Sequence, residues 1–222
     1  MPTTSDLTIA VQDYLKAIYA LEAAGERVTT SALAARMHVA APSATAMTKR
    51  LAELGLVERA PYRGVALTES GRLGALEVLR HHRLLERYLA DRLGLSLDEV
   101  HAEADRLEHA LSEELEAKID AELGYPTHDP HGDPIPDREL RVEAGRGRTL
   151  VDLEPGERAS VSRVPDGDPE LLRYLTGLGL VPGSDVELLT LAPFEGPVTV
   201  RTENGEHAIS RQLADRISAG DT

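Results

Sequence analysis

The chain has 222 residues, a formal net charge of −14 at pH 7 and a hydrophobic content of 41 %. It contains no Cys, which excludes disulfides and thiolate metal ligands, and its single Phe and missing Trp leave Leu, Ala, Val and Ile to build the cores. No apolar run approaches the roughly 20 residues that span a bilayer. Because the amino terminus also shows no signal-peptide pattern, we expect a cytoplasmic protein without a membrane partner.

The negative charge is distributed unevenly along the chain. Residues 1–72 contain eight Lys and Arg against seven Asp and Glu, a net of +1, which leaves 16 against 31, or −15, for residues 73–222. The overall charge therefore does not exclude DNA as a partner of the first third. The acidic remainder is either an ordinary solvated surface or a source of carboxylates that hold cations.

The first third predicts a winged helix-turn-helix. Apolar residues at helical spacing over residues 6–24 stop at Gly25 and indicate a first helix. "VTTSALAARMHV" and "AAPSATAMTKRLAELG" then indicate two short helices separated by about four residues, the second beginning at Pro42 and closing on Gly55. "LVERAPYRGVALTESGR" reads as a β hairpin around Tyr62–Gly64. A hairpin after a helix-turn-helix is a wing.

The rest of the chain divides into a helical middle and a β tail. The pattern is helical from Leu73 to Leu123 except near "GLSLDE", where Ser96 is placed to cap a helix. Short alternating segments between Gly and Pro turns predict a small β barrel or sandwich with one helical insert at "PELLRYLTGLG". We therefore expect a mainly α protein with small β parts: a winged helix over residues 1–73, a helical domain over 74–142, a linker over 143–150 and the β tail over 151–222.

The second helix of a helix-turn-helix enters the major groove with its first residues near base edges. Here hydroxyls, small apolar side chains and basic residues are available, but the first turn has no Asn, Gln or Arg that could read a base through two hydrogen bonds. The near-neutral charge of this part implies that two copies bind a palindromic site in double-stranded DNA, and hence a homodimer. The alternative is three packed helices that never touch DNA. The candidate DNA-binding residues are Pro42, Ser43, Thr45, Ala46, Lys49, Arg50 and Arg63.

The helical middle carries six of the eight His residues. In "HAEADRLEH" the side chains of His101, Asp105, Glu108 and His109 would share one stripe of an α-helix. "HHRLLER" would place His82 and Glu86 one turn apart on another helix, so two facing helices could enclose a cation. The alternative is that these acids only form surface salt bridges with Arg83, Arg87 or Arg106.

Patterns typical of enzymes are absent from the sequence. "DRLEH" approaches the zinc-protease pattern H-x-x-E-H but begins with Asp105, and neither H-E-x-x-H, G-x-S-x-G nor a P-loop occurs. We therefore expect that the protein is not an enzyme.

The order of parts resembles the diphtheria toxin repressor family of metal-dependent transcriptional regulators, in its three-domain form with an SH3-like (FeoA-like) tail. The segments "DYLKAIYALE", "HRLLERYL", "VHAEADRLEHALSEELE" and "HDPHGDPIP" carry this resemblance, which covers nearly the whole chain. It implies a repressor of metal-homeostasis genes that binds iron(II) or manganese(II). The implied metal ligands are Asp13, His82, Glu86, His101, Asp105, Glu108 and His109, and the tail adds Asp166, Asp168 and Glu170 as weaker candidates.

The departures within the resemblance favour manganese(II). Iron-responsive members carry Met at the position of Asp13 and Cys at that of Asp105, whereas manganese-responsive members carry carboxylates. A shell of oxygen and imidazole donors suits manganese(II) or iron(II) better than a thiolate shell would. Lys16 stands where manganese-responsive members have a further carboxylate, which argues against a two-metal cluster. Ala46 replaces a base-contacting Gln of iron-responsive members. An iron(II)-dependent repressor and a metal-independent winged-helix regulator remain as alternatives.

Overall fold

The computed structural model describes residues 7–60, 64–142 and 147–220. Its internal contacts divide the chain into two compact units, and each unit combines segments that are distant in sequence. The first unit consists of Met1–His82, Leu107–Ser112 and Pro136–Arg141, and the second of Arg83–Arg106, Glu113–Ile135 and Val142–Thr222.

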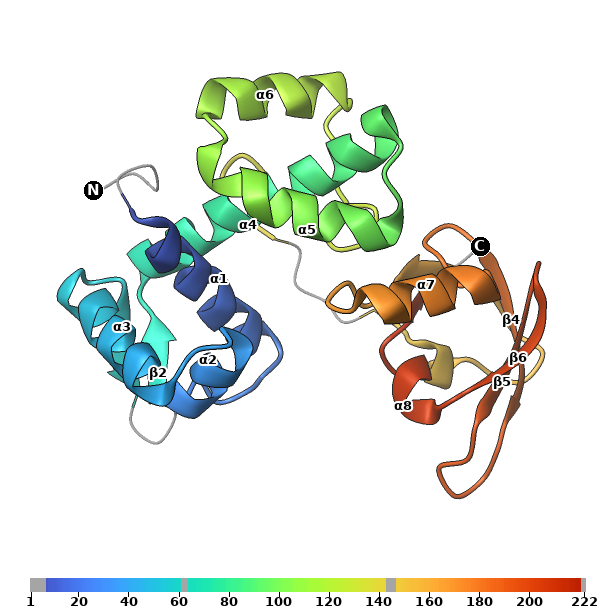
Figure 1. Cartoon of the computed structure of the whole chain (residues 1–222). Helices are drawn as coiled ribbons and strands as arrows, with labels where there is room; N and C mark the ends of the chain where they lie inside the picture. Colours follow the sequence, from blue (N-terminus) through green and yellow to red (C-terminus); the bar gives the residue numbers. More distant parts are fainter. Residues whose placement is uncertain (1–6, 61–63, 143–146, 221–222) are drawn as a thin grey trace. The chain divides into compact units, whose positions relative to one another are not determined.

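The first unit begins with the predicted winged helix-turn-helix (Figure 1). Its elements are α1 (Ile9–Ala23), α2 (Thr30–Arg36), α3 (Ala41–Glu53) and the antiparallel strands β1 (Val57–Ala60) and β2 (Gly64–Leu67). Leu15, Ile18, Leu33 and Leu51 are fully buried and join the three helices in one apolar core. The hydroxyl of Thr29 accepts a hydrogen bond from the backbone N–H of Ala32 and so caps α2. The predicted hairpin is confirmed, although its turn lies outside the described residues.

The helical middle is formed by α4 (Glu69–Leu93), α5 (Leu97–Leu107), the 3-10 turn η2 (Glu108–Ala110) and α6 (Glu113–Glu122). Ser96 directly precedes α5, and its backbone N–H and hydroxyl both donate to the carboxylate of Glu99, which fixes the start of that helix. Among the described residues, no helix combines the length and the apolar character needed to cross a membrane.

The α-helix predicted to carry all of His101 to His109 is shorter than the sequence pattern indicates. The α-helix ends at Leu107, and Glu108 and His109 lie on η2. A 3-10 turn has about three residues per turn instead of 3.6, and it commonly closes an α-helix. His101 and Asp105 belong to the second unit, whereas Glu108 and His109 belong to the first.

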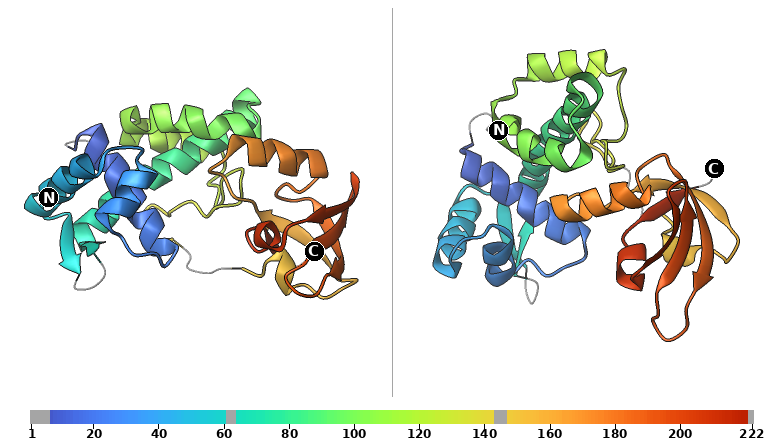
Figure 2. Two further views of the ribbon diagram at one scale, coloured as in Figure 1. Left: turned by 60° about the horizontal axis from the view of Figure 1, so that its bottom comes forward. Right: turned by 45° about the vertical axis from the view of Figure 1, so that its right-hand side comes forward.

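The carboxy-terminal part of the second unit is a five-stranded antiparallel sheet with the order β6-β5-β4-β3-β7 (Figure 2). Its inward residues pack on the helical insert, which is confirmed as α7, and on a short helix α8 that the sequence pattern did not predict. Strands β6 and β7 form two open edges, so the described sheet is that of an open SH3-like barrel. The elements are η3 (Leu150–Asp152), β3 (Arg158–Arg163), α7 (Pro169–Leu178), β4 (Asp185–Leu191), β5 (Val198–Thr202), β6 (Gly205–Ile209), α8 (Arg211–Ala214) and β7 (Ser218–Gly220).

A proline-rich turn over residues 128–135 docks on β3 within the second unit. The backbone N–H of Val164 donates to the carbonyl of His131 at 2.9 Å, and Arg163 Nε lies 2.8 Å from Asp133 Oδ1. Gly132 has a φ of +89°, and a Cβ at this position would lie 1.9 Å from the carbonyl oxygen of Ser162. The close approach of the two backbones therefore requires glycine at this position.

We expect Gly132→Ala to destabilise the second unit far more than Gly183→Ala. Both glycines have a positive φ, +89° and +87°, so both substitutions bear a similar backbone strain of about 1–2 kcal/mol. A Cβ on Gly183 meets no atom within 4 Å, whereas one on Gly132 overlaps the Ser162 carbonyl. The difference in the free energy of unfolding, measured with urea in chelator, should exceed about 2 kcal/mol. Equal losses in the two variants would contradict the docked arrangement.

Candidate metal centre

Three potential metal ligands meet in the first unit, where α1 lies against η2. Asp13, Glu108 and His109, hereafter the Asp13 site, each offer a ligand atom within 4.8 Å of the others. His109 Nε2 lies 3.0 Å from Asp13 Oδ1 and 3.5 Å from Glu108 Oε1. The Glu108 side chain is completely buried. Two carboxylates and one imidazole with converging ligand atoms are a donor set that fits a divalent metal.

A neighbouring amide orients the His109 ring. Gln12 is buried, its Nε2 donates to the carbonyl of Leu7 at 3.3 Å, and its Oε1 therefore faces His109 Nδ1 at 2.6 Å. Because an amide oxygen only accepts, Nδ1 donates to Gln12, and Nε2 is left facing the two carboxylates, where it could serve as a ligand atom. A metal-binding His typically donates its second N–H to an oxygen in this way.

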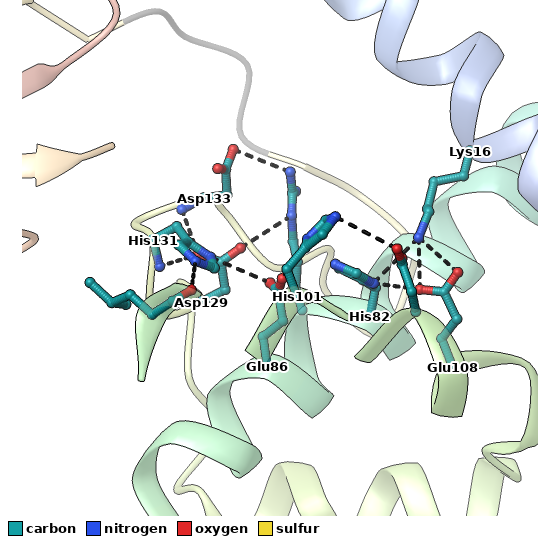
Figure 3. A network of polar contacts seen from close by, with 11 residues as sticks. Lys16, His82, Glu86, His101, Glu108, Asp129, His131 and Asp133 are labelled. Atoms are coloured by element: carbon teal, nitrogen blue, oxygen red, sulfur yellow. Dashed lines mark hydrogen bonds and ion pairs between the residues drawn. The ribbon is translucent and has the colours of Figure 1, made fainter. Parts of the chain in front are cut away.

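Lys16 places a cation beside the Asp13 site. Its Nζ donates to both carboxylate oxygens of Glu108, at 2.7 and 2.8 Å, and lies 3.3 Å from His82 Nδ1 (Figure 3). His82 is buried as well, and its Nδ1 lies 2.5 Å from Glu108 Oε2. Lys16 therefore pairs with the buried Glu108 carboxylate, and His82 contacts the same carboxylate.

The remaining predicted ligands of the helical middle lie in the second unit. Glu86 is completely buried, and its Oε1 lies 3.0 Å from His101 Nδ1. His101 Nε2 lies 3.7 Å from Asp105 Oδ2, and the Asp105 carboxylate is 47 % exposed. Asp105 as a metal ligand therefore stays a prediction that depends on the resemblance.

A second buried group of potential ligands surrounds Glu86. Glu86, Asp129 and His131, hereafter the Glu86 cluster, also have ligand atoms within 4.8 Å of one another. Burial, together with the charges of Glu86 and Asp133, raises the pKa of Asp129 to about 8. Burial by itself would lower the pKa of His131, but the Glu86 carboxylate raises it to about 9. Both pKa values are raised because several carboxylates are buried close together.

The simpler alternative, in which Arg83, Arg87 and Arg106 neutralise the predicted ligands, is wrong. Arg87 pairs with Asp91 and Arg106 pairs with Glu103, in both cases on the exposed face of their own helix. Arg83 pairs with Asp133 and approaches Asp129. Several acids lie near each arginine in the sequence, and spacing along a helix did not indicate which acid each arginine pairs with.

The candidates in the tail lie near the start of α7. Asp168 Oδ1 accepts hydrogen bonds from the backbone N–H groups of Glu170 and Leu171, so it caps that helix. Glu170 lies exposed in the first turn of α7, and Asp166 contributes its charge to the environment of Arg163. Within the described ranges, none of these three acids belongs to a group of three potential metal ligands.

The predicted DNA-binding residues form an exposed surface on α3. Pro42, Ser43, Thr45, Ala46, Lys49 and Arg50 are all exposed, and Arg63 lies outside the described residues. The buried residues Ala44 and Leu51 hold the opposite face of α3 on the core. The Thr45 hydroxyl donates to the carbonyl of Ala41 at 2.9 Å, so only its oxygen is available to accept from a base. This face of α3 therefore exposes hydroxyl, methyl and basic groups.

A winged helix whose first helix also carries the Asp13 site is the architecture of a metal-dependent DNA-binding regulator. Family models match in the same order: "Iron dependent repressor, N-terminal DNA binding domain" over residues 6–65, "Iron dependent repressor, metal binding and dimerisation domain" over 68–137, and "FeoA domain" over 148–219.

Individual relatives agree with these matches along most of the chain. The iron-dependent repressor IdeR of Mycobacterium tuberculosis is 35 % identical over 198 residues, covering 84 % of this chain and 86 % of its own. The diphtheria toxin repressor of Corynebacterium glutamicum is 32 % identical and covers 96 % and 95 %. A solved manganese-dependent transcriptional repressor in complex with manganese is 40 % identical, with a TM-score of 0.85 and coverage of 96 % and 100 %. The chain belongs to the diphtheria toxin repressor family of metal-dependent transcriptional repressors.

Sequence reasoning missed three residues that organise the two groups of ligands. Gln12 directly precedes Asp13, but nothing in the pattern indicated that its amide orients a histidine. Asp129 and His131 stand in "HDPHGDPIP", which was used only for its prolines and its resemblance. The alternation of acids and histidines around a Gly turn was the available signal.

Proposed function

We propose that the protein is a manganese(II)-activated repressor of metal-homeostasis genes, which acts in the cytoplasm as a homodimer on a palindromic operator. The observation that carries this proposal is the donor set of the Asp13 site, with two carboxylates and an imidazole whose Nε2 is turned toward them. Oxygen and imidazole donors suit manganese(II) or iron(II), and no thioether or thiolate is present among these three residues. Relatives support both metals, because solved neighbours include manganese-dependent repressors and IdeR is iron-dependent.

The mechanism follows from the elements that carry the ligands. Asp13 lies on α1, whose Leu15 and Ile18 belong to the same core as the recognition helix α3, while Glu108 and His109 lie on η2. A bound divalent ion supplies positive charge that both carboxylates can share. Asp13 is thereby held against η2, which would favour one orientation of the two α3 helices of a dimer. To move the population ratio of two such orientations from 1:99 to 99:1, the metal must bind the favoured orientation more tightly by about 5.5 kcal/mol.

A titration of operator binding with separate metals tests the proposal. Binding of the purified full chain to a palindromic promoter fragment is measured with manganese(II), iron(II) under anaerobic conditions, zinc(II) or chelator. We expect stimulation by manganese(II) at lower free concentration than by iron(II). The reverse order would establish the iron-dependent alternative. Equal binding in chelator and in manganese(II) would instead identify a metal-independent regulator.

Replacing Lys16 should strengthen metal binding and weaken the protein without metal. Lys16→Met removes a cation that contacts both oxygens of Glu108, so we expect manganese(II) to bind about tenfold more tightly, or about 1.4 kcal/mol. In chelator, the buried Glu108 loses its main partner, and the free energy of unfolding should fall by about 1–3 kcal/mol. Calorimetric titration and urea unfolding measure the two effects.

Lys118→Met is the matched control, because Lys118 pairs with Glu114 on the exposed surface of α6. It should leave both quantities unchanged, since exposed pairs contribute little. Weaker manganese(II) binding in Lys16→Met would mean that Lys16 supports the bound state instead of competing with the metal.

A further inference from the structure

Lys16 connects three elements of the first unit through one ammonium group. It lies on α1, and its Nζ donates to both carboxylate oxygens of Glu108 on η2, at 2.7 and 2.8 Å. The same Nζ lies 3.3 Å from Nδ1 of His82 on α4 (Figure 3). Protein groups alone therefore join α1 to the segment that carries Glu108.

The contact between Lys16 and Glu108 is shielded from water. The Glu108 side chain is 0 % exposed and that of Lys16 is 22 % exposed, whereas the side chains of the surface pair Lys118 and Glu114 are 68 % and 81 % exposed. Exposed ion pairs contribute little because water screens them. Removing one partner of a buried pair is costly, because the other partner stays buried without it. The Lys16 contact therefore restrains its two elements far more than a surface pair does.

Asp13 and Lys16 reach η2 from one face of α1, because residues three positions apart are neighbours on a helix surface. Asp13 Oδ1 lies 3.0 Å from His109 Nε2, which in turn lies 3.5 Å from Glu108 Oε1. Lys16 contacts both oxygens of Glu108. An ion at the Asp13 site and the ammonium of Lys16 would thus join the same two elements, α1 and η2.

The position of α1 determines the position of the DNA-binding surface. Leu15 and Ile18 are fully buried on α1 and pack in the core that also contains Leu51 of α3. Near the end of α1, Glu22 Oε1 accepts the backbone N–H of Leu67 on the wing strand β2 at 2.9 Å. Any contact that restrains α1 against η2 therefore also restrains the recognition helix and the wing.

We propose that Lys16 is a tethered cation that holds α1 against η2 when no metal is bound, and that it thereby sets the operator affinity of the metal-free chain. The proposal rests on the proposed function, because a metal ion would join the same two elements. The apparent affinity of a protein with two states falls with the fraction of molecules in the binding-competent state. Lys16 raises that fraction in the metal-free chain, so it limits the factor by which manganese(II) can increase operator binding.

A purely structural role of Lys16 makes a different prediction. If Lys16 only compensates the buried carboxylate of Glu108, its replacement lowers the free energy of unfolding but leaves the operator affinity of the folded chain unchanged. The tethered cation instead predicts a lower operator affinity under conditions in which the chain stays folded. Operator binding in chelator therefore distinguishes the two roles.

Fluorescence anisotropy of a labelled palindromic promoter fragment, titrated with the purified full chain in chelator, tests the proposal. We expect Lys16→Met to bind about tenfold more weakly than the unaltered chain, the size expected for the loss of a buried hydrogen bond between charged groups. Lys16→Arg should keep most of the metal-free affinity, since a guanidinium can donate to both oxygens of a carboxylate. Lys118→Met changes the net charge equally on the exposed surface of α6 and should bind like the unaltered chain.

The same titration in saturating manganese(II) separates the tether from a direct contact with DNA. Lys16→Met and the unaltered chain should then bind equally, because the ion joins α1 to η2 in both. A tenfold loss that persists in manganese(II) would overturn the proposal, since it would indicate that Lys16 contacts a phosphate of the operator. Equal affinity of the two proteins in chelator, or no measurable binding by either, would also overturn it.

Amide hydrogen exchange in chelator provides a measurement that does not involve DNA. The backbone amides of α1 and η2 should exchange faster in Lys16→Met than in the unaltered chain, while those of α7 in the second unit should not change. Unchanged exchange in α1 and η2 would contradict the tether. Missing manganese(II) stimulation in the unaltered chain would instead overturn the proposed function, and the comparison in chelator would still decide the role of Lys16.

Discussion

Glu108→Gln is expected to abolish the manganese(II) stimulation of operator binding while leaving a folded protein. The Glu108 side chain is completely buried and faces His109 in the Asp13 site, so the substitution removes an anionic donor at nearly constant volume. The amide oxygen can still accept from Lys16. A neutral amide is a much weaker ligand for a hard divalent ion, and we expect manganese(II) affinity to fall on the order of 100-fold or more.

Glu103→Gln is the matched control for this experiment. Glu103 lies on α5 and pairs with Arg106 at the exposed surface, so the change in net charge is the same but no candidate site is touched. Fluorescence anisotropy of a labelled operator, titrated with manganese(II), measures both variants beside the unaltered chain. Full stimulation in Glu108→Gln would show that the Asp13 site is not the sensor.

The architecture was predictable because periodicity reports which face of an element is buried. The helical spacing of Leu15 and Ile18, and the capping of α2 by Thr29, are local properties that the sequence displays directly. The end of α5 was not predictable in the same way. The composition of "DRLEHAL" permits both an α-helix and a 3-10 turn, and the contact of Glu108 with Lys16, 92 residues away, is not displayed by local composition.

The composition of the candidate site was partly predictable, but its orientation was not. The sequence and its resemblance indicated Asp13, Glu108 and His109, which the fold brings together. They did not indicate Gln12, because the role of an amide that sets a tautomer depends on a hydrogen bond between residues 97 positions apart. His131 was missed for a similar reason, since its partner Leu97 lies 34 positions away. Partners of this kind follow from tertiary packing and not from spacing.

Ala46→Glu should remove operator binding even in saturating manganese(II). Ala46 is exposed near the start of α3, and its small side chain is suited to contact a thymine methyl. A carboxylate at this position would be desolvated in the groove beside phosphates. Since the near-neutral winged helix has little electrostatic affinity to offset this repulsion, we expect a loss on the order of 100-fold. Manganese(II) binding, measured by calorimetry, should be unchanged because Ala46 lies outside the Asp13 site.

Ala52→Glu separates contact from net charge, because Ala52 is exposed on the last turns of the same helix and the substitution adds the same charge. If α3 enters the groove by its first turns, Ala52→Glu should weaken operator binding by less than about fivefold. A loss of that size is expected when an added negative charge only weakens the long-range attraction to the phosphates. Equal losses in the two variants would mean that repulsion at a distance explains both. Full operator binding by Ala46→Glu would exclude α3 as the recognition helix. A loss confined to Ala46→Glu would indicate that the operator contacts the start of α3.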